Sequence, residues 1–211
     1  MLGMIKRDLI LMFSSKQERL FFLLYIPFLM LIVDSYDPKY LYLVILITYT
    51  YLTSITPFSY DVSSKASYIM NSLPISRREI VVYKYLSVFV YFVLTIVYAG
   101  VYLWIINKIG IKNVDYFNFE MIKTAIPIIL ISISIVFPAY LRFEPKIAQI
   151  IHMVVFMTFF IGIVNLANLG DSSMAAYFEL ISKEIYILLI SIAIYILSLL
   201  FSMKVYKRRD L

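Results

Sequence analysis

Hydroxyl groups recur at helical spacing in one apolar stretch of the chain, residues 40–60. Five of them are separated by three, four or seven positions: Tyr42, Tyr49, Thr53, Thr56 and Tyr60. This spacing places them on one face of a helix. Within a membrane such a face normally borders protein or a water-lined cavity, because hydrocarbon offers hydroxyls no partners. The alternative is that the hydroxyls bond back to their own helix and that the tyrosines belong to an interfacial belt. Hydroxyls and aromatic rings without fixed charge suit the binding of amphipathic ligands.

Residue sets for catalysis or metal binding are missing from the sequence. The chain contains no cysteine and one histidine, His152, which excludes thiolate chemistry and a histidine-cluster metal site. Its five glycines are scattered and form no Gly-x-x-x-x-Gly-Lys-Ser/Thr loop, so ATP would be bound and hydrolysed by another chain. We expect no catalytic residue, metal or cofactor in this chain. Because no titratable partner accompanies His152, we interpret it as a packing residue.

Composition predicts that these residues lie in a membrane protein. Hydrophobic residues fill 63% of the 211 positions and the mean hydropathy is +0.90, whereas soluble domains are about 45–50% apolar. A spanning helix needs about 20 residues. We therefore predict one all-α integral membrane domain, 1–211, with six transmembrane helices at about 20–36, 40–60, 80–106, 124–141, 147–168 and 185–203.

Charge indicates the orientation of these spans. The uncharged apolar runs inside these spans are 20–33, 40–60, 85–106, 124–141, 147–168 and 185–203, and apart from His152 they hold no Asp, Glu, Lys, Arg or His. This disfavours ion-coupled carriers and voltage sensors, because these need charge at membrane depth. By the positive-inside rule both termini are cytosolic. The net charge of +6 is then a sign of topology and not of nucleic-acid binding. Of the 19 basic residues, the side opposite the termini holds only Lys39, Lys108, Lys112, Lys123 and Lys183.

A polar cytosolic segment, 61–79, separates the second and third spans. Near its end the order Ser76-Arg77-Arg78-Glu79 predicts a capping box, in which the serine hydroxyl and the glutamate carboxylate cap the start of a helix. Just before it, Leu73-Pro74 interrupts any helix, because proline disfavours helical geometry at the residue that precedes it. We expect a short helix, a break, and then a helix that runs into the membrane.

The stretch before the first span, 1–18, predicts an amphipathic elbow helix in the headgroup region. Its apolar residues recur at helical spacing, with Lys6, Arg7 and Asp8 off the apolar stripe. A frayed basic tail is the alternative. The stripe consists of Leu2, Ile5, Leu9 and Met12.

One run carries a resemblance to a known family. Residues 71–81, Asn-Ser-Leu-Pro-Ile-Ser-Arg-Arg-Glu-Ile-Val, followed by Lys84-Tyr85, together with the six-span layout, resemble the small six-span type-2 ABC exporter permeases of Gram-positive bacteria. That group includes the phenol-soluble-modulin exporter permease subunits. The resemblance implies a bacterial cell-membrane permease in which segment 61–79 contains the coupling helix that docks on a cytosolic ABC ATPase.

The same resemblance implies the partners and the site residues. Two ATPase copies would bind ATP and Mg²⁺, and a second permease chain, identical or homologous, would complete the complex. The translocation path would lie where spans two and five meet, and we assign to it Tyr49, Thr53, Thr56 and Asn165. The contact core on the ATPase would be Tyr68, Ile69, Met70, Asn71, Leu73, Pro74 and Ile75, with Arg77 and Arg78 on its rim.

The expected cargo follows from the uncharged, hydroxyl-rich stripe in span two. Such a wall suits amphipathic or hydrophobic peptides, antimicrobial or cytolytic, or drugs. The alternative is a membrane accessory, sensor or immunity protein that binds a partner and transports nothing. The two functions differ in what a neighbouring gene should encode: an adjacent gene for an ATPase would favour the exporter.

Overall fold

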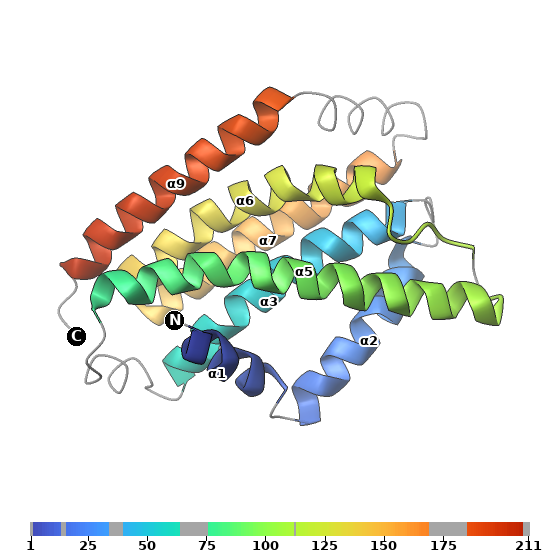
Figure 1. Cartoon of the computed structure of the whole chain (residues 1–211), viewed down its shortest axis with the longest axis horizontal. Coiled ribbons are helices and arrows are strands. Elements are labelled where there is room, and N and C mark those ends of the chain that lie inside the picture. The colour runs from blue at the N-terminus through green and yellow to red at the C-terminus, as the bar shows by residue number, and fades with distance from the viewer. Residues whose placement is uncertain are drawn as a thin grey trace.

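The computed structural model describes residues 2–13, 16–33, 40–63, 76–111, 113–168 and 185–208, and all regular structure in these ranges is helical. Five of the helices are long and apolar enough to cross a membrane, in agreement with the predicted all-α multi-pass membrane protein. The helices are α1 (Leu2–Met12), α2 (Lys16–Val33), α3 (Leu41–Ser63), α5 (Arg77–Ile109), α6 (Phe119–Arg142), α7 (Pro145–Asn168) and α9 (Ile185–Lys207) (Figure 1).

The five candidate spans are α3, α5, α6, α7 and α9. Helix α2 occupies the place of the first predicted span, but its apolar part in the described residues, Arg19–Leu31, is shorter than the others. It contains Pro27, which removes one backbone hydrogen bond from the helix interior. The number of six spans therefore stays a prediction.

Helix α3 is the centre of the bundle. It packs against α1, α2, α5, α6 and α7, and every residue from 40 to 51 is buried. Its polar residues are accommodated because their hydroxyls bond to the preceding turn: Thr48 donates to the Val44 carbonyl at 2.7 Å and Ser54 donates to the Thr50 carbonyl at 2.7 Å. Such bonds satisfy a hydroxyl where water is excluded.

A polar seam joins α9 to α5 and α6. The Tyr85 hydroxyl lies 2.8 Å from the hydroxyls of both Ser198 and Ser202, and Ser198 donates to the Ser134 carbonyl at 2.7 Å. The Tyr195 hydroxyl donates a hydrogen bond to the Tyr85 carbonyl at 2.8 Å. Hydrogen bonds of this kind hold membrane helices together, since lipid offers no hydrophobic driving force between them.

Both ends of α5 are capped by side chains or glycine. The predicted capping box is confirmed: Glu79 N–H donates to Ser76 Oγ at 3.2 Å, and Ser76 N–H donates to Glu79 Oε2 at 3.0 Å. At the other end Gly110 has φ of 78°, the left-handed geometry that terminates helices. Helix α5 thus begins as a defined structure directly after residues 64–75.

The chain after α5 folds back onto the helix. The Asn107 side chain bonds both backbone groups of Val114, and Phe117, with φ of 51°, places its ring where a Cβ at Gly100 would lie. A side chain at position 100 must therefore push this ring away. Nothing comparable surrounds Gly162 in α7.

Replacing Gly100 tests this contact. We expect Gly100→Ala to lower stability by about 1 kcal/mol, because overpacking outweighs the gain in helix propensity. In a Phe117→Ala background the same change should stabilise the protein by up to about 1 kcal/mol, as should Gly162→Ala alone. Thermal unfolding in detergent measures all four variants. If Gly100→Ala changes stability by the same amount in the wild-type chain and in Phe117→Ala, the contact with the Phe117 ring is absent.

Candidate functional site

The contact core predicted for the ATPase lies outside the described residues, but both of its flanks are described. Helix α3 ends at Ser63 and α5 begins at Arg77. Arg77 Nη1 donates to the Lys207 carbonyl at 3.2 Å, which ties the start of α5 to the end of α9, whereas Arg78 is exposed. The undescribed members of the core are Tyr68, Ile69, Met70, Asn71, Leu73, Pro74 and Ile75.

Four charged side chains meet between these flanks, and we call them the charge cluster: Arg7, Asp8, Asp61 and Lys84. Asp61 lies in the last turns of α3, Lys84 in the second turn of α5, and the other two come from α1. Lys84 Nζ lies 2.8 Å from Asp61 Oδ2 and 3.3 Å from Asp8 Oδ2. Arg7 Nη2 lies 2.6 Å from Asp8 Oδ1 and 3.0 Å from Asp61 Oδ1. Each cation therefore bridges both carboxylates.

Burial makes the charge cluster energetically demanding. The exposed fractions are 0% for Asp8, 2% for Lys84 and 8% for Asp61, and the ammonium also lies 4.7 Å from the centre of the Phe58 ring. Removing such charges from water costs several kcal/mol per ion, which only complete pairing repays. Two cations and two carboxylates balance here, so each buried ion depends on partners of opposite charge.

The guanidinium of Arg7 keeps its charge in this setting. Burial by itself lowers the pKa of Arg7, but attraction to Asp61 and hydrogen bonding to Asp8 outweigh it, so the pKa is raised above its ordinary value. The cation is therefore present at any pH at which the protein is folded.

The sequence interpretation of α1 needs one correction. It placed Asp8 on the solvated side of the helix, yet Asp8 is fully buried. Position 8 follows Ile5 by three residues and precedes Met12 by four, so it belongs to the same buried face. A buried acid on an apolar stripe needs a cation as partner, and Lys84, at 3.3 Å, is that cation.

The predicted path residues on α3 differ in their hydrogen-bond partners. The Tyr49 hydroxyl donates to the Phe22 carbonyl of α2 at 2.9 Å, whereas Thr53 and Thr56 bond back to their own helix, at 3.0 and 2.8 Å. Both options that the hydroxyl spacing left open are therefore realised. The side chain of Asn165 lies outside the described residues.

Helix α3 meets α7 through Tyr51 and His152, and neither residue belongs to the predicted translocation path. The Tyr51 hydroxyl lies 3.0 Å from His152 Nδ1, and the two rings stack with centroids 5.4 Å apart. His152 thus joins two helices, as expected of a packing residue. In the described part of the chain no group of three or more His, Cys, Asp or Glu residues is placed to hold a metal ion.

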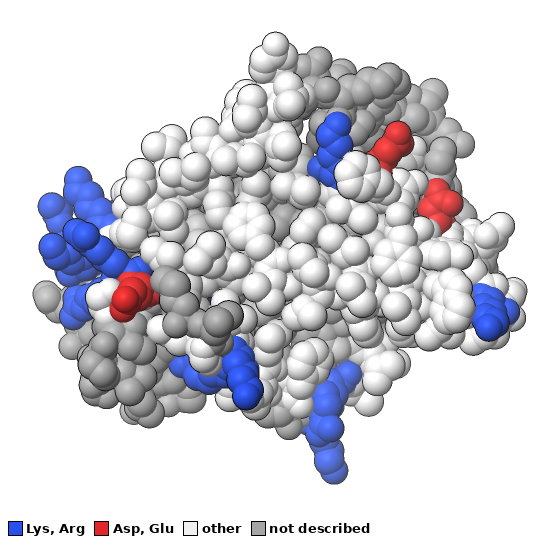
Figure 2. Space-filling view, in the orientation of Figure 1, with Lys and Arg blue, Asp and Glu red and all other residues white. Residues whose placement is uncertain are grey.

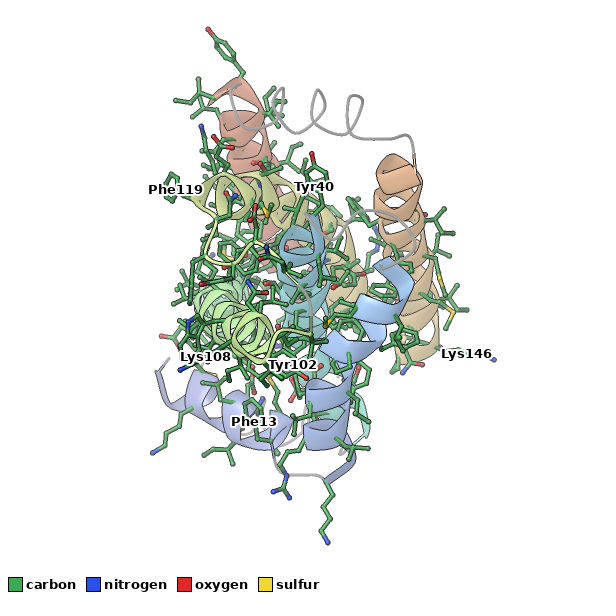
Figure 3. The ribbon with its side chains drawn as sticks, turned by 90° about the vertical axis from the view of Figure 1, so that its right-hand side faces the viewer. Phe13, Tyr40, Tyr102, Lys108, Phe119 and Lys146 are labelled. Carbon is green, nitrogen blue, oxygen red and sulfur yellow. The ribbon has the colours of Figure 1, made fainter. Side chains whose placement is uncertain are left out.

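A cavity of about 550 Å³ lies between α1, α2, α3 and α5. Its volume falls in the range of small-molecule sites, about 300–1,000 Å³. Tyr49 and Thr53 border it from α3. Phe13, directly after α1, and Tyr102 of α5 border it as well (Figure 3). The wall is almost entirely apolar.

Comparison with known proteins gave one match. The family model described as ABC-2 family transporter protein matches residues 3–207, nearly the whole chain. No curated protein and no solved structure matches this sequence.

Removal of a single member tests the charge cluster. We expect Lys84→Met to lower the free energy of unfolding by about 3–5 kcal/mol, because it leaves two buried carboxylates with one cation. Adding Asp61→Asn should restore most of this loss, since Arg7 and Asp8 then remain as a balanced pair.

Unfolding in SDS measures the free energy of unfolding of the wild-type chain, of Lys84→Met and of the double variant with Asp61→Asn. Lys108→Met is the matched control. Lys108 is exposed over the Trp104 ring, so its loss should cost about 1 kcal/mol or less. A double variant no more stable than Lys84→Met would contradict mutual charge compensation.

Proposed function

The chain belongs to the ABC-2 family of transporter proteins, and we propose that it forms the translocation path of an exporter and is driven through the cytosolic segment 61–79 by a separate cytosolic ATPase. Its family makes it a multi-pass membrane component of an ABC transporter, the transport part and not the catalytic one. Permeases of this family work with a cytosolic ATPase. The observation that supports coupling at this place is the charge cluster.

The charge cluster joins both ends of residues 64–75. Asp61 precedes the segment and Lys84 follows it, and their side chains lie 2.8 Å apart. The capping box at Ser76 holds the start of α5 in helical geometry. A partner that pushes on the segment therefore moves the ends of α3 and α5 together, with α1 attached through Asp8. Packed helices respond to such a push by shifting as units, because their interfaces are not continuously deformable.

For the contact with the ATPase we propose the residues selected from the resemblance. Tyr68, Ile69, Met70, Asn71, Leu73, Pro74 and Ile75 would form its core, and Arg77 and Arg78 its rim. The exposure of Arg78 supports this position. Two ATPase copies would bind ATP and Mg²⁺, and two permease chains, identical or homologous, would face each other in a bacterial cell membrane with both termini in the cytosol.

For the path we propose Tyr49, Thr53, Thr56 and Asn165. Their support is the spacing of the three α3 residues, four and three positions apart, which places them on one face of the helix. In the described conformation α3 meets α7 through Tyr51 instead, so the four residues would line one path only after α3 has turned relative to α7. Alternating access supplies such a movement, and Pro57 inside α3 provides a place for the helix to bend.

The proposed cargo is an amphipathic or hydrophobic peptide or drug. The support is the stripe of uncharged aromatic and hydroxyl-bearing side chains along α3, which includes Tyr49, Thr53 and Thr56. The small six-span exporters of Gram-positive bacteria, which the run at 71–81 resembles, are the proposed subgroup. An accessory, sensor or immunity protein is the second candidate, and it would bind a partner other than an ATPase.

A charged substitution in the contact core separates these two functions. We expect Leu73→Asp with Ile75→Asp to lower affinity for the ATPase by more than about tenfold, because each buried anchor of an interface contributes about 2 kcal/mol. The chain alone should hydrolyse no ATP. Co-purification with the ATPase and substrate-stimulated ATP hydrolysis are the measurements.

Ile111→Asp is the matched control, because Ile111 is 67% exposed at the opposite end of α5. It should leave binding and hydrolysis unchanged. Full transport by the Leu73→Asp, Ile75→Asp variant, or no ATPase bound to the wild-type chain, would favour the accessory protein.

A further inference from the structure

The cavity beside α1 is a lateral groove with one wall open to the surroundings of the bundle. That wall is a stripe on α5 made of Leu94, Val97, Val101 and Ile105, which are 44–52% exposed and lie three or four residues apart. Such a stripe of a membrane helix faces lipid or another membrane helix.

The groove exposes almost no polar surface. The Thr95 hydroxyl bonds the Tyr91 carbonyl at 2.8 Å, and the hydroxyls of Tyr49 and Tyr98 both donate to the Phe22 carbonyl, at 2.9 and 3.0 Å. With these hydroxyls engaged, the groove presents carbon and ring surface. An apolar chain fits it better than a polar molecule.

Positive charge surrounds the α1 side of the groove. Lys6 lies one turn before Leu9, and Arg19 one turn before Phe22; Leu9 and Phe22 both line the groove. Lys6, Lys16 and Arg19 are exposed, and Figure 2 shows basic side chains projecting from α1 and from the start of α2 along the lower edge. Outside the charge cluster, residues 2–19 carry these three cations against one acid, Glu18.

We propose that the groove binds one acyl chain of an anionic membrane phospholipid, whose headgroup is held by Lys6, Lys16 and Arg19. Hydrocarbon gains no hydrophobic energy on moving from the bilayer into the groove. Filling it only restores dispersion contacts that a void would lack. Selectivity therefore comes from the headgroup, where each basic residue near a membrane surface contributes about 1 kcal/mol.

This lipid would hold α1 next to the charge cluster. Leu9 and Met12 line the groove while Asp8 on the same helix is buried in the cluster. The lipid site does not rest on the proposed function, since the chain alone is sufficient to form it.

Native mass spectrometry of the purified chain, titrated with phosphatidylglycerol or with phosphatidylcholine of the same acyl chains, tests the site. The wild-type chain should bind phosphatidylglycerol more tightly. Lys6→Gln with Lys16→Gln should weaken that binding about fivefold for each charge removed and leave phosphatidylcholine binding unchanged. Lys108→Gln, at the other end of α5, is the control and should bind as the wild-type chain does.

Variants that fill the groove test its place. Val101→Trp, and separately Leu94→Trp, should abolish the preference for phosphatidylglycerol, whereas Leu197→Trp on the exposed face of α9 should keep it. Thermal unfolding in lipid-free detergent identifies the folded variants. Equal binding of the two lipids by the wild-type chain, or an undiminished preference in both groove variants, would overturn the proposal. Displacement of phosphatidylglycerol by a stoichiometric amphipathic peptide would assign the groove to cargo and overturn it as well.

Discussion

Lys84 is buried between the carboxylates of Asp8 and Asp61, and Arg7 closes the set on the other side. None of the three buried ions is tolerable in this place without a partner of opposite charge, because an unpaired buried charge costs more than any single contact returns. The three helices that supply them are therefore held together at the end next to residues 64–75. The mechanism proposed for transport depends on this constraint, since a push on a short segment is useful only if its two ends move as one.

Helix α1 connects the charge cluster with the lateral groove. Asp8 is buried in the cluster, and Leu9 and Met12 border the groove. On the far side of the bundle, the seam of Tyr85 with Ser198 and Ser202 fastens α9 to α5. Helix α5 thus takes part in the cluster, the groove and the seam, which explains how a movement at its capped start can reach both faces of the bundle.

Local patterns in the sequence were sufficient to predict the helices, but they were insufficient to predict the charge cluster. Apolar runs of span length identified five helices, and the order Ser-Arg-Arg-Glu identified the cap at Ser76, because such signals lie within a few residues. The ion pairs join residues 54 and 76 positions apart, which no periodicity reveals. Asp8 was therefore assigned to the wrong face. The spacing of the hydroxyls indicated one face of α3 but not whether they bond across to α2, as Tyr49 does, or back, as Thr53 does.

The distance between α1 and α5 during ATP hydrolysis tests the central claim most directly. The chain has no cysteine, so spin labels can be attached without a competing site at Ile10→Cys in α1 and Leu86→Cys near the start of α5, which are both exposed. In the complex with its ATPase, pulsed electron paramagnetic resonance should give one narrow distance distribution that is the same with and without ATP and Mg²⁺. Adding Lys84→Met should broaden it. A distance that changes with nucleotide in the otherwise unaltered chain would contradict helix ends that move as a unit.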